Sequence, residues 1–143
     1  MRALGLDIGD RRIGVAVSDP TGLVARPLTV LRRRSEPQVA EAVQALIDEL
    51  RVDVVVVGIP LLADGTRGRQ AEKTLAFVRY LQRRLTRPVE TWDERFSTQD
   101  AERELVAMGV RRRRRREMLD AAAAAVMLDD WLTARRARPT PSM

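Results

Sequence analysis

The sequence contains no cysteine and no histidine among its 143 residues. Their absence excludes disulfides, thiolate chemistry and the usual zinc ligands, and it also excludes a Ser-His-Asp triad or a Cys-His pair. Any hydrolytic chemistry must therefore rely on carboxylates. Carboxylates favour oxygen-preferring metals such as magnesium or manganese.

Aromatic residues are scarce, and no apolar run approaches the ~20 residues that are needed to span a bilayer. Hydrophobic residues still make up 45% of the chain, so one compact domain can build its core from Val, Leu, Ile and Ala. The first residues lead directly into a predicted strand and do not resemble a signal peptide. We therefore expect a cytoplasmic protein.

Lysine is nearly absent as well: 25 of the 26 basic residues are arginine, and only Lys73 is lysine. The net charge of +6 favours a polyanionic partner. Genome base composition can explain the choice of arginine over lysine, but it does not explain the net positive charge.

The stretch LGLDIGDRRIGVAVSD at residues 4–19 predicts a β-hairpin. Apolar residues alternate first with Gly5, Asp7 and Gly9 and then with Gly14, which is the period of a β-strand. Glycine weakens a strand and usually marks a close approach by backbone or ligand. On this stretch alone, Asp7 fits either a functional carboxylate or an aspartate on the solvent face of an ordinary hairpin.

The rest of the chain alternates between helical and strand patterns. Residues 24–31 predict an edge strand because they contain Pro27, and the valine-rich run at 53–59 predicts a parallel strand that is buried on both faces. We expect a further strand at 88–92 and helices at 35–50, 67–85, 97–108 and 117–132. The order βββαβαβαα predicts an α/β fold. Its mixed five-stranded sheet has three antiparallel strands, then two parallel ones, with helices on both faces.

Three carboxylates fall where apolar or small residues would be expected. Asp7 lies on a core strand, Glu94 just past a strand end, and Asp120 at the start of a buried helix. Clustered carboxylates repel one another unless a divalent cation lies between them. A pair of such ions can activate water and stabilise the leaving oxygen of a phosphodiester.

Four motifs cover nearly the whole chain: LGLDIGDRRIGVAVSD at 4–19, GIPLLADGT at 58–66, DERFST at 93–98 and DAAAAAVML at 120–128. In this order they closely resemble the YqgF/RuvX family of Holliday-junction-resolvase-like or pre-16S rRNA nuclease proteins. The resemblance implies an RNase H-like nuclease domain over residues 1–134 and phosphodiester cleavage with Mg²⁺ or Mn²⁺. We expect residues 135–143 to form a disordered tail.

The acidic residues of the family map onto Asp7, Glu94 and Asp120. The resemblance thus implies that these three residues bind the metal and carry the catalysis. Asp93 is the alternative middle ligand, because either carboxylate of the D-E-R sequence could reach the metal.

The basic residues and the loops each have two interpretations. The run of Arg111, Arg112, Arg113, Arg114, Arg115 and Arg116 precedes a predicted helix N-terminus, where positive charge is unfavourable. This favours a nearby polyanion over a merely solvated surface. Arg11, Arg12 and Arg95 fit either phosphate contacts or local structural roles. The residues expected to shape loops, either facing nucleic acid or only ending strands, are Gly9, Gly14, Gly58, Pro60, Asp64 and Gly65.

The leading hypothesis is a metal-dependent nuclease that processes the 5′ end of pre-16S rRNA. A Holliday junction resolvase is the alternative, but it makes two symmetric cuts and normally works as a dimer. The sequence has no obvious dimer surface, which favours a monomer. An ATP-binding module of the actin or sugar-kinase type shares the Asp-x-Gly hairpin but needs two such domains. A catalytically silent nucleic-acid-binding protein has no reason to keep repelling carboxylates together.

Overall fold

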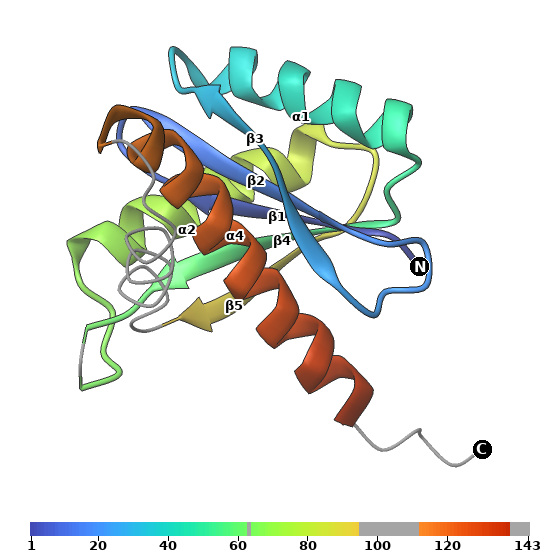
Figure 1. Cartoon of the computed structure of the whole chain (residues 1–143). Coiled ribbons are helices and arrows are strands. Elements are labelled where there is room, and N and C mark those ends of the chain that lie inside the picture. Colours follow the sequence, from blue (N-terminus) through green and yellow to red (C-terminus); the bar gives the residue numbers. More distant parts are fainter. Residues whose placement is uncertain (63, 95–111, 138–143) are drawn as a thin grey trace.

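We describe residues 1–62, 64–94 and 112–137 of a computed structural model of the chain, with the side chains of the last segment from Met118 onward. A five-stranded mixed sheet forms its centre, in the order β3-β2-β1-β4-β5 (Figure 1). Neighbouring strands are antiparallel among the first three, and β4 runs parallel to β1 and β5. This confirms the predicted fold class. The strands are β1 (Ala3–Ile8), β2 (Arg12–Ser18), β3 (Ala25–Arg32), β4 (Val54–Pro60) and β5 (Val89–Glu94).

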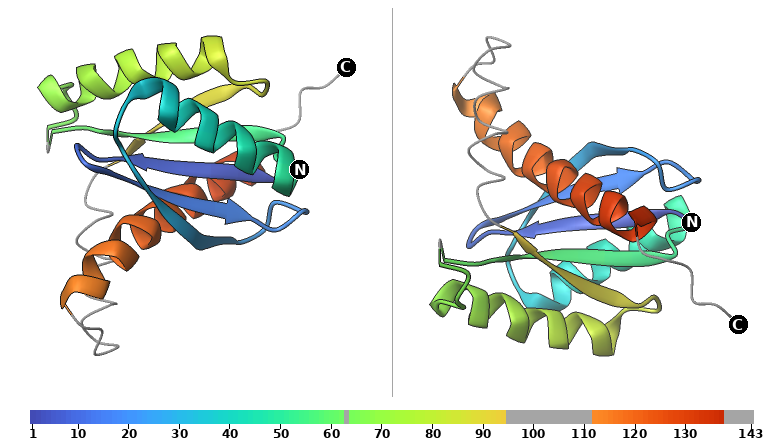
Figure 2. Two further views of the ribbon diagram at one scale, coloured as in Figure 1. Left: turned by 90° about the horizontal axis from the view of Figure 1, so that it is seen from above. Right: turned by 90° about the horizontal axis from the view of Figure 1, so that it is seen from below.

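The alternation of side chains along the strands separates two cores. Leu4 and Leu6 of β1 face the layer formed by α1 (Glu36–Leu50) and α2 (Arg69–Arg84). Ala3 belongs to the opposite face, which packs against α4 (Arg112–Ala137). Figure 2 shows α1 and α2 on one side of the sheet and α4 on the other. On β1 and β2 the α4 face carries small residues, namely Ala3, Gly5, Gly14 and Ala16.

Two sequence predictions about individual strands are confirmed. β4 is buried from Val54 to Ile59 and lies between two parallel neighbours. β3, which contains Pro27, forms an edge of the sheet. The start of α1 is also as expected, because Ser35 Oγ accepts a hydrogen bond from the Gln38 backbone nitrogen at 3.3 Å.

The bounds of α4 differ from the prediction at both ends. The sequence predicts that Arg112–Arg116 precede the helix, whereas α4 begins at Arg112. Arginine is a good helix former, so the unfavourable charge near the N-terminus does not prevent these turns. Residues 135–137, predicted to be disordered, are helical. Here the Arg135 guanidinium lies 5.4 Å from the centre of the Trp131 ring, and Arg136 donates a hydrogen bond to the Gly22 carbonyl at 3.0 Å.

The predicted helix at 97–108 and the rest of the predicted tail, 138–143, lie outside the described residues. In the ranges that the structure describes, no helix is long and apolar enough to cross a membrane.

Candidate active site

Glycine at one position of β2 allows α4 to touch the sheet. Gly14 lies opposite Asp7 in the β1–β2 pairing. A β-carbon on Gly14 would lie 1.8 Å from the Asp120 carbonyl oxygen, so no larger residue fits there without moving α4. This close approach brings Asp120 of α4 next to Asp7 of β1.

Asp7 has an unfavourable environment for a carboxylate. Its burial raises the pKa of the carboxyl group from 3.8 to about 6, and the negative charge of Asp120 adds to the shift. No hydrogen bond from another described residue reaches its carboxylate. Asp7 is thus held beside a like charge, and no donor from the described part of the chain compensates for it.

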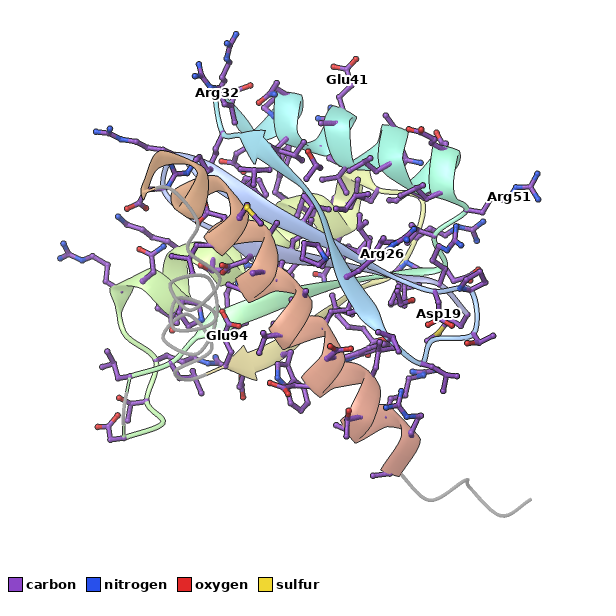
Figure 3. The ribbon with its side chains drawn as sticks, viewed as in Figure 1. Asp19, Arg26, Arg32, Glu41, Arg51 and Glu94 are labelled. Atoms are coloured by element: carbon purple, nitrogen blue, oxygen red, sulfur yellow. The ribbon has the colours of Figure 1, made fainter. Side chains whose placement is uncertain are left out.

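Glu94 is the last residue of β5 and folds back over β4 (Figure 3). A β-carbon on Gly58 would lie 2.9 Å from the carboxyl carbon of Glu94, so Gly58 leaves room for this side chain. Burial raises the pKa of Glu94 to about 8, with further contributions from the charges of Asp7 and Asp130. Its Oε2 atom is buried and makes no hydrogen bond within the described part of the chain.

Asp120 has a cationic partner. The Nε atom of Arg12 donates a hydrogen bond to Asp120 Oδ2 at 2.7 Å, and this is the one ion pair among the described residues. Arg12 is the first residue of β2 and is half exposed. Asp120 therefore lies between the cation of Arg12 and the anion of Asp7.

Asp93 and Glu94 lie on opposite faces of the sheet. Trp92 packs against the core beneath α4, and side chains alternate along a strand, so Glu94 shares this face while Asp93 does not. Asp93 is exposed, whereas Glu94 is coupled to Asp7. Glu94 rather than Asp93 is the carboxylate that this geometry brings to Asp7.

The three carboxylates do not form a closed metal cage by themselves. No group of three or more acidic side chains in the described ranges is arranged to hold a metal ion. Asp7 is nevertheless electrostatically coupled to both Asp120 and Glu94. The donor set fits a hard divalent cation, because it consists of carboxylate oxygens and includes the buried, unpaired Oε2 of Glu94.

The predicted loop residues shape the edge of the sheet around this site. Gly9 makes the tight β1–β2 turn, because a β-carbon there would lie 2.6 Å from the Arg12 carbonyl oxygen. Pro60 pairs with Glu94 at the ends of β4 and β5. In the following loop, Asp64 Oδ1 accepts hydrogen bonds from Thr66, and Gly65 has a φ of 86°.

The predicted basic residues are only partly described. Arg11 is exposed in the β1–β2 turn, next to Arg12. Arg95 and Arg111 lie outside the described residues, and the backbone of Arg112–Arg116 forms the first turns of α4. Sequence reasoning missed Asp130, which acts on Glu94, and Arg33, which supports the β1–β2 turn. No local pattern marks either residue, because both interactions depend on how distant elements pack.

The chain is similar to known proteins in sequence and in fold. The model of the RuvX family, described as Holliday junction resolvase, matches residues 1–134. This chain belongs to the RuvX family. Two RuvX relatives carry the name "Putative pre-16S rRNA nuclease". The one from Synechococcus sp. (strain JA-3-3Ab) is 51% identical over 94% of this chain and 84% of its own length. The one from Halothermothrix orenii is 46% identical over 78% of this chain and 80% of its own.

Solved structures show the fold. T. thermophilus RuvC in complex with Holliday junction substrate has a TM-score of 0.58 and 19% identity, covering 96% of this chain and 97% of RuvC. The fowlpox virus Holliday junction resolvase has a TM-score of 0.57 and 13% identity, covering 94% of this chain and 99% of its own. The RuvX chain therefore has the fold of these resolvases, which is the RNase H-like fold.

Proposed function

We propose that this chain is a nuclease that depends on a divalent metal ion, Mg²⁺ or Mn²⁺, and processes the 5′ end of pre-16S rRNA. Membership of the RuvX family makes it an enzyme that hydrolyses phosphodiester bonds. The names of the relatives support the RNA substrate. A ribosomal RNA precursor as substrate would place the reaction in the cytoplasm.

One observation carries the metal dependence. Asp7 is coupled to Asp120 on one side and to Glu94 on the other, and Glu94 Oε2 is buried without a hydrogen bond to any described residue. A carboxylate that is repelled by two others is unfavourable unless a cation neutralises the group. Asp7, Glu94 and Asp120 would hold that ion, with Glu94 preferred to Asp93.

The metal ion and the side chains around it would have different roles in cleavage. A bound divalent ion would supply charge neutralisation and polarise a phosphate oxygen. Asp7 and Glu94 would orient the reacting centre from the ends of β1 and β5, and the packing of α4 on Gly14 keeps Asp120 beside them. Arg12 orients Asp120 through its 2.7 Å hydrogen bond.

The test offers three substrates to the purified protein with Mn²⁺ or Mg²⁺: a pre-16S rRNA fragment, single-stranded DNA and a four-way DNA junction. We expect cleavage of the RNA at its 5′ side, and no cleavage when EDTA is present. Mn²⁺ should also raise the melting temperature, because it binds the folded site and not the dispersed carboxylates of the unfolded chain. Full cleavage in EDTA would contradict the metal dependence.

Resolution of Holliday junctions is the second candidate, and the family description favours it. A resolvase places two active sites symmetrically on one junction. We propose a monomer, which favours the RNA substrate. Paired cuts in the junction, together with intact RNA and a dimeric protein in solution, would select the resolvase instead.

A further inference from the structure

Two turns that are distant in the sequence lie together at the edge of the sheet next to the candidate active site. Arg12 at the start of β2 is paired with Arg32 at the end of β3. The backbone nitrogen of Arg33 donates to the Arg11 carbonyl at 2.9 Å, and the Arg33 guanidinium donates to the Gly9 carbonyl at 3.0 Å. The β1–β2 turn and the chain that leaves β3 are therefore fixed to each other.

Three exposed arginines lie on these joined turns: Arg11, Arg32 and Arg34. We call them the turn patch. None of them makes an ion pair with a described residue, because the pair of Arg12 and Asp120 is the only one in that part of the chain. Two acidic residues, Asp10 and Glu36, are exposed in the same segments, but neither approaches a cation within ion-pair distance in the described structure.

The turn patch concentrates like charges. Directly opposed side chains of the same sign destabilise a pair of strands, and Arg12 and Arg32 are opposed in this way. Two arginines at the ends of other elements do have partners among the described residues. Arg84 covers Tyr80, and Arg136 binds the Gly22 carbonyl. The exposed arginines of the turn patch have no such partner among the described residues.

The position of the patch relates it to the candidate active site. Arg12 belongs to the same turn as Arg11 and donates its hydrogen bond to Asp120. Asp7 lies on β1 just before this turn. Figure 3 shows Arg32 projecting from the end of β3, away from the sheet. A chain of phosphates that reaches the carboxylates can therefore continue directly over the patch.

We propose that the turn patch binds the phosphate backbone of the nucleic acid next to the bond that is cleaved. This inference rests on the proposed function, and it extends the site beyond the arginines that the sequence indicates. Arg33 fixes the turn that carries Arg11. Its guanidinium lies 4.7 Å from the centre of the Phe77 ring and holds the Gly9 carbonyl, so the turn is fixed before the substrate arrives.

The test compares two triple variants that lose the same charge. The first, Arg11→Gln/Arg32→Gln/Arg34→Gln, removes the patch. The matched control, Arg26→Gln/Arg79→Gln/Arg87→Gln, removes three exposed arginines that lie elsewhere and make no hydrogen bond or ion pair with the described residues. Arg26, for example, lies at the opposite end of β3 from Arg32 (Figure 3). Thermal melts establish that both variants fold.

Binding of a fluorescent single-stranded RNA is measured by anisotropy in EDTA, where no cleavage occurs, over a series of salt concentrations. We expect the patch variant to bind about 10- to 100-fold more weakly than the parent at low salt. Each lost phosphate contact should reduce the slope of log affinity against log salt by about 0.7, so three contacts reduce it by about 2. The control should stay within about half a unit of the parent slope.

Equal slopes and affinities for the patch variant and the control would overturn the inference. So would loss of binding to vesicles of anionic lipid in the patch variant while RNA binding is unchanged. Cleavage by the parent is assayed separately. A parent that binds RNA through the patch but cleaves nothing would leave the patch as a phosphate-binding surface and refute the proposed function. A patch variant with unchanged binding, made from an active parent, would refute only the inference.

Discussion

Asp7 and Asp19 lie near opposite ends of the same β-hairpin and have opposite environments. Asp19 accepts four hydrogen bonds in the β2–β3 turn: two from Thr21, one from the Leu23 nitrogen at 2.7 Å and one from the Val24 nitrogen at 2.9 Å. These bonds, with that of the Thr21 side chain foremost, lower the pKa of Asp19. Asp7 has no such donors among the residues that the structure describes, and burial and the charge of Asp120 raise its pKa to about 6.

The difference separates two uses of the same residue type. The donors around Asp19 stabilise its charged form, and the charge in turn orders the turn. The surroundings of Asp7 destabilise its charged form, which is unfavourable for the folded chain by itself. Carboxylates whose pKa is raised, like that of Asp7, are common at functional sites, where a bound cation stabilises their charged form. The contrast therefore predicts opposite consequences of the same substitution at the two positions.

The largest expected effect is that of Asp7→Asn on cleavage. Loss of a central metal ligand should reduce the rate by on the order of 10³-fold or more. In the metal-free protein, Asp7→Asn should melt at the parent temperature or above it, because it removes a repelling charge and nearly keeps the shape. Asp19→Asn should instead lower the melting temperature and leave the metal site intact. The measurements are thermal melts with and without Mn²⁺, together with a nuclease assay.

The opposite result is expected if Asp7 has only a structural role. An ordinary structural aspartate leaves its hydrogen-bond partners unsatisfied when it is replaced, which destabilises by about 1–3 kcal/mol. An Asp7→Asn variant that is destabilised to that extent and still cleaves would remove Asp7 from the site.

The next effect concerns the contact that brings Asp120 to Asp7. Gly14→Ala would place a β-carbon 1.8 Å from the Asp120 carbonyl oxygen, which belongs to the backbone and cannot rotate away. We expect a loss of about 3 kcal/mol in the free energy of unfolding, together with lower activity because α4 moves away from β2. The measurement is chemical denaturation beside the nuclease assay.

Gly5→Ala is the matched control for this change, since Gly5 also lies beneath α4. Its β-carbon would lie 3.0 Å from the Leu128 β-carbon, which small shifts can relieve. It should be destabilised by about 1 kcal/mol and remain active. Equal losses in the two variants would mean that the contact at Gly14 is not special.

Much of this architecture can be predicted from the sequence, because burial follows simple periods. The run DVVVVGI indicates a strand buried on both faces, and it forms β4 at the centre of the parallel part of the sheet. The alternation of Gly5, Asp7 and Gly14 with apolar residues indicates a face of small side chains. The sequence does not reveal that α4 is the element that uses this face.

The candidate site is less predictable, because it depends on contacts between distant segments. Asp93 and Glu94 are neighbours, and only the packing of α4 shows which face of β5 matters. The ion pair between Arg12 and Asp120 joins residues 108 positions apart. The start of α4 at Arg112 was not predictable from charge, because helix propensity outweighs the local repulsion.

A smaller effect concerns pH in the metal-free protein. Glu94 has a pKa of about 8 in the folded chain and an ordinary value of 4.5. Between these values the folded chain holds a proton that the unfolded chain has lost, so stability falls as pH rises through this window. Asp7 lowers the stability in the same way, but only between pH 3.8 and about 6. We therefore expect stability to keep falling from pH 6 to pH 8 because of Glu94.

Glu94→Gln should abolish this decline above pH 6 and raise stability at pH 8 by at least about 1 kcal/mol, since one pKa unit corresponds to about 1.4 kcal/mol. Asp93→Asn, which changes the exposed neighbour, should keep the parent slope. Denaturation curves at a series of pH values in EDTA measure both. A decline that disappears in Asp93→Asn and persists in Glu94→Gln would show that the middle carboxylate is misassigned.

The smallest expected effect on stability is that of Arg12→Gln. The ion pair with Asp120 is partly exposed, with 40% of the Arg12 side chain and 26% of the Asp120 side chain accessible, so its loss should destabilise by no more than about 1 kcal/mol. Its effect on metal binding should be larger. Asp7 repels Asp120, and Arg12 holds Asp120 Oδ2 at 2.7 Å against that repulsion. Residues that orient a metal ligand change metal affinity by about 10- to 100-fold.

Arg11→Gln provides the control, because it removes the same charge one residue earlier from an exposed side chain without a hydrogen bond to the described residues. If charge alone mattered, losing a cation near the site would strengthen Mn²⁺ binding in both variants. If Arg12 orients Asp120, calorimetric titration without nucleic acid should give weaker Mn²⁺ binding for Arg12→Gln and unchanged or stronger binding for Arg11→Gln. The two explanations therefore predict opposite signs for Arg12→Gln, and binding as tight as in the parent would show that Asp120 needs no partner to reach the metal.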